Sequence, residues 1–168
     1  DTANNINTTA TRTIKLDNAV PSTITYQTPS ETAGGSASRN YILVNVTAAD
    51  SVGLANITIY LFNSTNSQIN SSTSATSPAY VNFSGLPEGI YYFNATATDY
   101  VNLKNSTSTR NVTLDTTVPL VSYGTGTENS GANFSRTNIY VNVSVTETNE
   151  ANITFLLYNS TSQYNSTT

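Results

Sequence analysis

Residues 86–99 read LPEGIYYFNATATD, a turn followed by a strand. Pro87 and Gly89 are turn residues. From Tyr91 to Thr98 apolar and polar side chains alternate, with the apolar side chains at the odd positions. A period of two is typical of a β-strand that buries one face. The pattern therefore predicts a strand over residues 91–98, with its odd positions in a hydrophobic core.

Further segments show the same alternation, and turn residues such as Gly34-Gly35 separate them. No stretch has the 3.6-residue period of a helix. Roughly seven short strands per repeat, each with one apolar face, predict an all-β fold, an antiparallel β-sandwich of two sheets. The additional predicted strands cover residues 23–27, 41–48, 56–61, 80–83 and 110–114.

The sequence repeats itself. Residues 110–119 (RNVTLDTTVP) mirror residues 12–21 (RTIKLDNAVP), which is an offset of 98, and the same offset pairs Asp1 with Asp99. Fixed self-similarity is the signature of a repeat architecture. Shorter motifs return at offsets of 97 and 96, because loops tolerate single-residue changes: VNVT at 44–47 as VNVS at 141–144, NIT at 56–58 as NIT at 152–154, and NST at 63–65 as NST at 159–161.

These offsets divide the chain into three parts. We expect residues 1–20 to be the end of a preceding repeat, with its last strand and a joint. Residues 21–118 are predicted to form one complete sandwich, and residues 119–168 the first half of a following repeat. We expect a window of a longer array; the alternative is an intact subunit whose ends are completed by neighbours.

The joint at residues 114–119 (LDTTVP), the segment 95–99 (ATATD) and the turn at residues 86–91 (LPEGIY) resemble tandem immunoglobulin-like or fibronectin-III-like repeats (Ig-like repeats) of prokaryotic cell-surface and filament proteins. The richness in Asn, Ser, Thr and Tyr resembles archaeal members. The resemblance covers the whole chain. It implies Ig-like sandwiches in a linear array, an extracellular location, and a tyrosine corner at Tyr91. The alternative for Tyr91 is a plain core aromatic.

Composition excludes several classes of site. The 168 residues include 23 Asn, 30 Thr and 21 Ser but no Cys or His, so zinc, haem and iron–sulfur sites of the usual types are excluded, as is a Ser-His nucleophile. A net charge of −4 makes nucleic acid an unsuitable partner. The longest apolar runs are too short to span a membrane.

The sequence contains 14 N-glycosylation sequons, Asn-x-Ser/Thr, against about seven expected by chance from its Ser and Thr content. A glycan on a strand needs an outward asparagine, because it cannot enter a packed core. The alternative is that outward positions are simply polar, but threonine would suit a strand better than asparagine. The predicted strand sites, all on polar phases, are Asn45, Asn56, Asn82, Asn94, Asn111, Asn142 and Asn152; those in loops or strand ends are Asn63, Asn70, Asn105, Asn159 and Asn165; Asn7 and Asn133 complete the set.

Calcium takes carboxylate and carbonyl oxygens, which makes four aspartates candidate ligands: Asp17, Asp50, Asp99 and Asp115. Glu147 replaces Asp50 in the next repeat. The acids look scattered, so we expect no metal cofactor and expect Asp50 and Asp99 to cap turns instead. Scattered acids also give no carboxylate pair for glycoside hydrolysis, and we expect no enzyme.

The expected function is structural: a glycosylated extracellular filament, sheath or cell-surface stalk whose contacts run end to end. The alternative is an adhesin that recognises glycans or another cell, since Tyr41, Tyr60, Tyr92 and Tyr140 lie on outward phases. If the chain is an intact subunit, residues 7–16 of one copy are predicted to complete residues 119–168 of another by strand addition.

Overall fold

The computed structural model of the protein describes residues 2–168. These residues fall into two compact units, the first ending at Leu114 and the second beginning at Asp115. Every regular element of the described residues is a β-strand. No helix in this part of the chain has the length and apolar character needed to cross a membrane.

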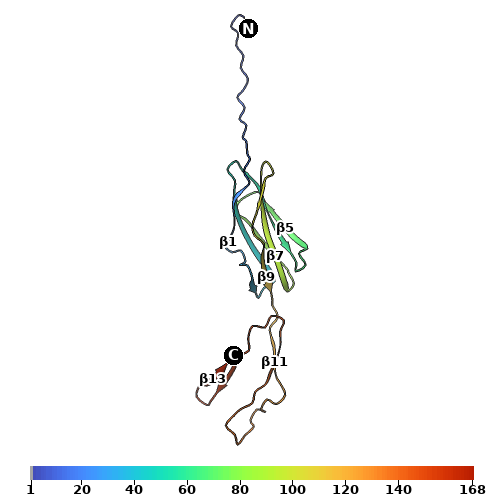
Figure 1. The fold of residues 1–168 in the computed structure, drawn as a ribbon, viewed down its shortest axis with the longest axis vertical. Coiled ribbons are helices and arrows are strands. Elements are labelled where there is room, and N and C mark those ends of the chain that lie inside the picture. The colour runs from blue at the N-terminus through green and yellow to red at the C-terminus, as the bar shows by residue number, and fades with distance from the viewer. Residues whose placement is uncertain (1) are drawn as a thin grey trace. The chain divides into compact units, whose positions relative to one another are not determined.

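The first unit is built from two sheets (Figure 1). One sheet has the order β1-β3-β6, and the other has the order β2-β9-β7-β4-β5 with β8 added to β7. All strand pairs are antiparallel except β2 with β9. The strands are β1 (Ser22–Gln27), β2 (Gly35–Ala37), β3 (Tyr41–Ala49), β4 (Leu54–Phe62), β5 (Gln68–Ser74), β6 (Ala79–Ser84), β7 (Gly89–Asp99), β8 (Lys104–Ser106) and β9 (Arg110–Leu114).

The core of the first unit lies between the two sheets, and it is filled by side chains from every second position of the strands. Strand β3 alternates buried and half-buried residues along its length, and β7 does the same from Tyr91 onward. The prediction of an all-β sandwich with the odd positions of 91–98 inside is confirmed. The buried apolar side chains are Ile42, Val44, Val46, Ala48, Ile57, Ile59, Leu61, Ala79, Phe83, Tyr91, Phe93, Ala95, Ala97, Val112 and Leu114.

Tyr91 forms the tyrosine corner that the sequence predicts. Tyr91 is 6% exposed, and its hydroxyl donates a hydrogen bond of 2.9 Å to the carbonyl oxygen of Pro87, four residues upstream. Burial raises the pKa of the Tyr91 phenol. The bond fixes the turn from which β7 starts, so it sets the position of a strand that pairs with β4, β8 and β9.

Replacing Tyr91 by phenylalanine is expected to lower the free energy of unfolding by about 0.5–1.5 kcal/mol, the net value of one neutral hydrogen bond. Pro87 is exposed, so its carbonyl oxygen regains water in the variant. The melting temperature should fall by a few degrees, measured by circular dichroism. A variant as stable as the wild type would show that Tyr91 acts only as a core aromatic.

Tyr26 connects the two sheets. It lies on β1, and its ring meets Phe93 of β7 edge to face, with 5.6 Å between the ring centroids. The Tyr26 hydroxyl donates to the carbonyl oxygen of Ser108 (2.8 Å) and accepts from the Thr107 hydroxyl (2.9 Å). The guanidinium of Arg110 lies 4.0 Å from the centroid of the Tyr26 ring. A half-buried side chain thus carries apolar, polar and cation–π contacts across the sandwich.

Three strands of the first unit are missing from the predicted set. Strand β5 has the sequence QINSSTS, which shows no apolar alternation because β5 is a largely exposed edge strand. Short strands β2 and β8 also lie beside longer partners. The predicted loop or strand-end positions of Asn70 and Asn105 are therefore wrong, since Asn70 lies within β5 and Asn105 within β8.

Residues 4–21 form no regular secondary structure, although residues 12–16 have the sequence pattern of β9. Ile14 and Leu16 are 81% and 89% exposed. A strand needs a hydrogen-bonded neighbour, and none of the described strands pairs with this segment. The segment reaches the sandwich at Pro21, which is fully buried. The predicted end of a preceding repeat, residues 1–20, also includes Asp1, which lies outside the described residues.

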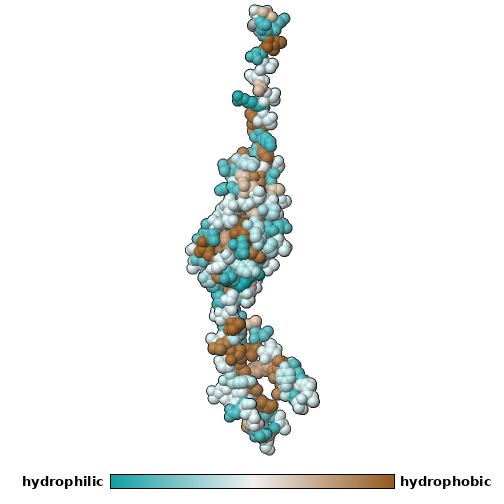
Figure 2. All heavy atoms as spheres, turned by 180° about the vertical axis from the view of Figure 1, so that it is seen from behind, coloured by the Kyte–Doolittle hydropathy of each residue, from teal (hydrophilic) through white to brown (hydrophobic). Residues whose placement is uncertain are grey.

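The second unit contains β10 (Leu120–Tyr123) paired with β11 (Val143–Thr146), and β12 (Phe155–Tyr158) paired with β13 (Gln163–Thr167). Within this unit many large apolar side chains are exposed, as Figure 2 shows by their colour. Asn142 and Asn152 lie before β11 and β12 and not within strands as predicted. Asn165 lies within β13 and not in a loop or at a strand end. Asn45 is the equivalent of Asn142 in the first unit, where it lies in β3 and pairs with both β1 and β6. Residues 115–168 contain no strand equivalent to β6, so Asn142 lacks one of these two neighbours.

Candidate functional site

The sequon asparagines all have access to solvent in the described part of the chain. None is buried, which agrees with the requirement that a glycan point outward. Exposed are Asn7, Asn70, Asn82, Asn133, Asn142, Asn152, Asn159 and Asn165; partly exposed are Asn45, Asn56, Asn63, Asn94, Asn105 and Asn111.

Some sequon side chains are held against the protein by the nitrogen that a glycan would modify. Asn45 Nδ2 donates to Thr28 O (2.8 Å), and Asn45 Oδ1 is buried. Asn105 Nδ2 donates to Pro21 O (2.9 Å). The side chains of these two asparagines therefore stabilise the folded chain through hydrogen bonds, which the sequon pattern alone does not reveal. Asn82, on β6, is exposed.

The hydrogen bonds around Asn45 recur 97 residues later. Asn142 Nδ2 donates to Thr125 O (3.2 Å), as Asn45 does to Thr28 O. The Ser30 hydroxyl bridges the backbone N–H and C=O of Asn45, and the Thr127 hydroxyl does the same for Asn142. The Glu31–Arg39 ion pair has its counterpart in Glu128–Arg136.

Strand register recurs in the same way. Tyr26 pairs with Val46 between β1 and β3, and Tyr123 pairs with Val143 between β10 and β11. The β4–β5 pair has a register shift after Leu61, and the β12–β13 pair has one after its counterpart Leu157. The second unit thus reproduces the β1–β3 and β4–β5 pairings of the first.

Three of the four predicted calcium candidates lie together at one end of the first unit. One carboxylate oxygen each of Asp17, Asp50 and Asp99 lies within 4.8 Å of the other two. Asp17 comes from the segment before β1, Asp50 from the loop after β3, and Asp99 from the end of β7. The expectation that the acids are scattered is therefore wrong for these three. Strand order explains it, because the ends of β3 and β7 and the start of β1 all lie at this end of the sandwich.

The predicted turn caps are confirmed. Asp50 Oδ1 accepts the backbone N–H groups of Gly53 and Val52, both at 2.8 Å, and these bonds lower the pKa of Asp50 below its usual value. Asp99 Oδ1 accepts the backbone N–H groups of Val101 (2.8 Å) and Leu103 (2.9 Å). Each cap uses one carboxylate oxygen, so capping leaves the second oxygen of each aspartate available.

Two oxygens of the cluster are buried without a hydrogen-bond partner in the described structure: Asp17 Oδ2 and Asp99 Oδ2. Asp99 is 1% exposed. A substrate cannot reach a side chain as deeply buried as that of Asp99. The oxygens of the cluster suit the binding of a hard cation.

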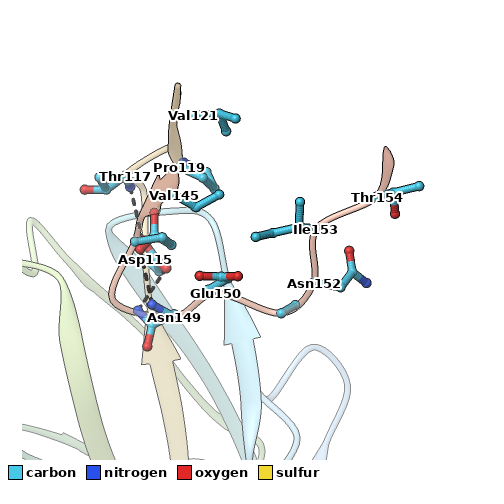
Figure 3. A pocket seen from close by; sticks show the side chains of 12 residues that line it. Asp115, Thr117, Pro119, Val121, Val145, Asn149, Glu150, Asn152, Ile153 and Thr154 are labelled. Atoms are coloured by element: carbon cyan, nitrogen blue, oxygen red, sulfur yellow. Dashed lines mark hydrogen bonds between the residues drawn. The ribbon is translucent and has the colours of Figure 1, made fainter. Parts of the chain in front are cut away.

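Asp115, the fourth candidate, lies in the second unit. It accepts from Thr117 N (3.1 Å), as Asp17 does from Ala19 N, and its Oδ2 accepts from Asn149 Nδ2 (2.9 Å). Figure 3 shows Asp115, Asn149 and Glu150 beside a pocket of about 410 Å³ that Glu147 also lines. Glu147 Oε1 accepts from Asn149 N (3.2 Å), as Asp50 Oδ1 accepts from Val52 N at the equivalent position.

The outward tyrosines are spread over more than one sheet. Tyr41 lies on β3 under the guanidinium of Arg39, and Tyr140 precedes β11 in the second unit. Tyr60 on β4 and Tyr92 on β7 share a sheet, and Tyr92 is the register partner of Phe62. The rings of Tyr60 and Phe62 are 6.3 Å apart. These neighbouring aromatic residues form a partly exposed face, called here the aromatic face: Tyr60, Phe62 and Tyr92.

The two sheets, the tyrosine corner and the strand order define the first unit as an Ig-like or fibronectin-III-like β-sandwich. The chain is similar to the solved structure of the fibronectin(III)-like modules of Clostridium thermocellum CbhA, with 17% identity and a TM-score of 0.46. The match covers 76% of this chain and 64% of that one, so the chain spans less than two thirds of its length. No family model matches the chain. No curated protein matches it.

Proposed function

We propose that this chain is a structural, non-catalytic part of an extracellular, N-glycosylated array of Ig-like sandwiches, such as a stalk, sheath or filament. The observation that carries the proposal is the repeated strand register, Tyr26 with Val46 and Tyr123 with Val143. Successive modules with the same internal contacts favour a linear array. A module of this fold supports either a structural or a binding role.

The exposed apolar side chains of the second unit are an argument for an array. Leu120, Val121 and Tyr123 of β10 are 70%, 60% and 79% exposed. In the first unit, strands β6, β7 and β9 add further apolar side chains to the core. The proposal is that further strands of the array, or another copy by strand addition, cover the corresponding face of the second unit.

Glycans would add to the solubility of a chain with only 10% charged residues, because sugars can take over the role of surface charge. The sequons support glycans on both sheets of the first unit, for example at the exposed residues Asn82 of β6 and Asn70 of β5. Glycans on the outer faces would block sideways association and leave the ends of each module free for contacts.

Glycopeptide mass spectrometry of protein recovered from the cell envelope tests this function. We expect sugar masses on several sequons, with higher occupancy at exposed Asn82 and Asn70 than at Asn45 and Asn105, whose side-chain nitrogens are engaged. Unmodified peptides throughout, or protein confined to the cytoplasmic fraction, would sink the proposal. Equal occupancy at all four sites would contradict only the accessibility argument.

The aromatic face favours the second candidate, an adhesin. Tyr60, Phe62 and Tyr92 lie side by side on the six-stranded sheet, and aromatic rings can stack on sugars. An adhesin requires saturable binding of free oligosaccharides that is lost in a Tyr60→Ala/Tyr92→Ala variant and retained in Tyr140→Ala. Binding that survives the double substitution would exclude this face as the site.

A further inference from the structure

We propose that Asp17, Asp50 and Asp99 bind one calcium ion, which fastens the segment at residues 17–21 to the end of the sandwich. The proposal goes beyond the structural role above and assigns a metal site. One oxygen from each of the three carboxylates lies within 4.8 Å of the others. The three side chains come from three separate parts of the first unit, so their convergence is a product of the fold and not of local sequence.

The buried oxygen of Asp99 is the second, independent observation. Asp99 is 1% exposed, and its Oδ1 already accepts two backbone N–H groups. Asp99 Oδ2 has no hydrogen-bond donor in the described structure, and Asp17 Oδ2 is in the same condition. A buried carboxylate oxygen without a partner is unfavourable, and a bound cation supplies the missing partner.

Charge points in the same direction. The three carboxylates are like charges at close range, and such groups repel each other unless a cation neutralises them. The two ion pairs found within residues 2–168 are Arg39–Glu31 and Arg136–Glu128, so neither brings a basic side chain to the cluster. A divalent cation would neutralise the repulsion between the carboxylates, and it would coordinate the oxygens that lack a hydrogen-bond donor.

The ligand chemistry selects calcium. The chain has no His or Cys, so the site offers only oxygen, which hard cations prefer. Calcium–oxygen distances of 2.3–2.6 Å allow two ligands on opposite sides of the ion to be about 4.6–5.2 Å apart, which matches the observed cluster. Magnesium needs shorter distances and strict octahedral geometry, and it retains several waters.

The ion would act at the joint. Asp17 belongs to the segment that leads into β1, whereas Asp50 and Asp99 belong to the sandwich. This segment is otherwise held at Pro21, which is buried and whose carbonyl oxygen accepts from Asn105 Nδ2 (2.9 Å). Calcium adds a second attachment four residues earlier, and it thereby limits the directions in which residues before Asp17 can leave the sandwich.

Calcium titration of the 168-residue chain tests the site. Extracellular calcium modules bind with dissociation constants of 10⁻⁴–10⁻³ M, so 10 mM calcium is expected to raise the melting temperature by about 5–15 °C over protein in EGTA. Isothermal titration should show one site. Asp17→Asn should lose most of the shift while its stability in EGTA stays close to wild type, because asparagine keeps the acceptor for Ala19 N.

Asp115→Asn is the matched control, since Asp115 makes the same local bond to Thr117 N but lies outside the cluster. It should keep the full calcium shift. Asp99→Asn, which retains the turn-capping oxygen, should lose it. An absence of calcium-dependent heat and shift at 10 mM would overturn the proposal, as would an equal shift in Asp17→Asn or an equal shift with 10 mM magnesium.

Limited proteolysis with trypsin tests whether calcium attaches the segment around Asp17 to the sandwich. Lys15 lies two residues before Asp17, whereas Arg12 lies further out on the exposed segment. Calcium should slow cleavage after Lys15 several-fold and leave cleavage after Arg12 nearly unchanged, and Asp17→Asn should abolish the difference. Equal slowing at both bonds would show that calcium does not act through Asp17.

Discussion

Replacing Phe93 by alanine is expected to lower the free energy of unfolding of the first unit by about 3–5 kcal/mol, the range for large aromatic truncations in cores. Phe93 is 0% exposed at the middle of β7 and meets the ring of Tyr26 edge to face. The substitution removes the largest fully buried side chain and leaves a cavity that two sheets held by several strand pairs cannot close. The loss is a large share of the 5–15 kcal/mol that stabilises an ordinary domain.

Urea denaturation followed by tyrosine fluorescence measures this effect. Phe93→Leu is the control, because leucine keeps most of the volume and loses only the edge-to-face contact, so its midpoint should lie between those of wild type and Phe93→Ala. A Phe93→Ala variant destabilised by less than about 1 kcal/mol, well under the expected range, would show that the two sheets do not pack on this residue.

The second large effect is expected at Tyr26. Tyr26→Ala removes the Phe93 contact, the Arg110 cation–π contact and the hydroxyl that joins Thr107 to Ser108. Because the side chain is only half buried, we expect a loss of about 2–4 kcal/mol, below the full range for core aromatics. Tyr26→Phe should lose about 0.5–1.5 kcal/mol, the share of the hydroxyl. Similar losses in both variants would mean that the ring contributes little.

The Tyr26 phenol also predicts a pH dependence. Burial raises its pKa above the usual value, and the Thr107 hydrogen bond and the Arg110 charge oppose the rise. The fold therefore prefers the neutral phenol. This contribution is fully present below the unfolded pKa of about 10, and it is lost as the pH rises through the higher folded pKa. The stability difference between wild type and Tyr26→Phe should shrink between pH 9 and pH 11, measured by urea unfolding.

Much of the fold follows from the sequence, because most strands have one face of apolar side chains and one of more polar side chains, and this difference is visible as alternation along the chain. In β3 from Ile42 to Ala48 and in β7 from Tyr91 to Ala97 every buried position is apolar, so alternation locates each strand and its inward face. Strand β5 could not be found in this way, because an edge strand with mostly exposed residues has no apolar face to reveal it. For the same reason the sequence predicts a loop or strand end at Asn70, which lies within β5 at an exposed position.

The acid cluster could not be predicted from spacing, because Asp17, Asp50 and Asp99 are more than 30 residues apart in the chain. Their meeting depends on which strand ends share one end of the sandwich. Strand order gives that information: Ser22 pairs with Ala49, and Leu54 pairs with Asp99. A topology drawn from the sequence could have brought the three together, whereas the burial of Asp99 Oδ2 required coordinates.

The parallel pairing of β2 with β9 has a mechanical consequence. Gly35 pairs with Val112 and Ala37 with Leu114, and β2 lies toward the N-terminal side of the unit while β9 ends it. In a parallel pair, tension applied to the start of β2 and to the end of β9 pulls the two strands along each other in opposite directions. All of their hydrogen bonds then carry load together in shear, instead of opening one after another. Rupture under such tension requires the hydrogen bonds of the pair to fail together.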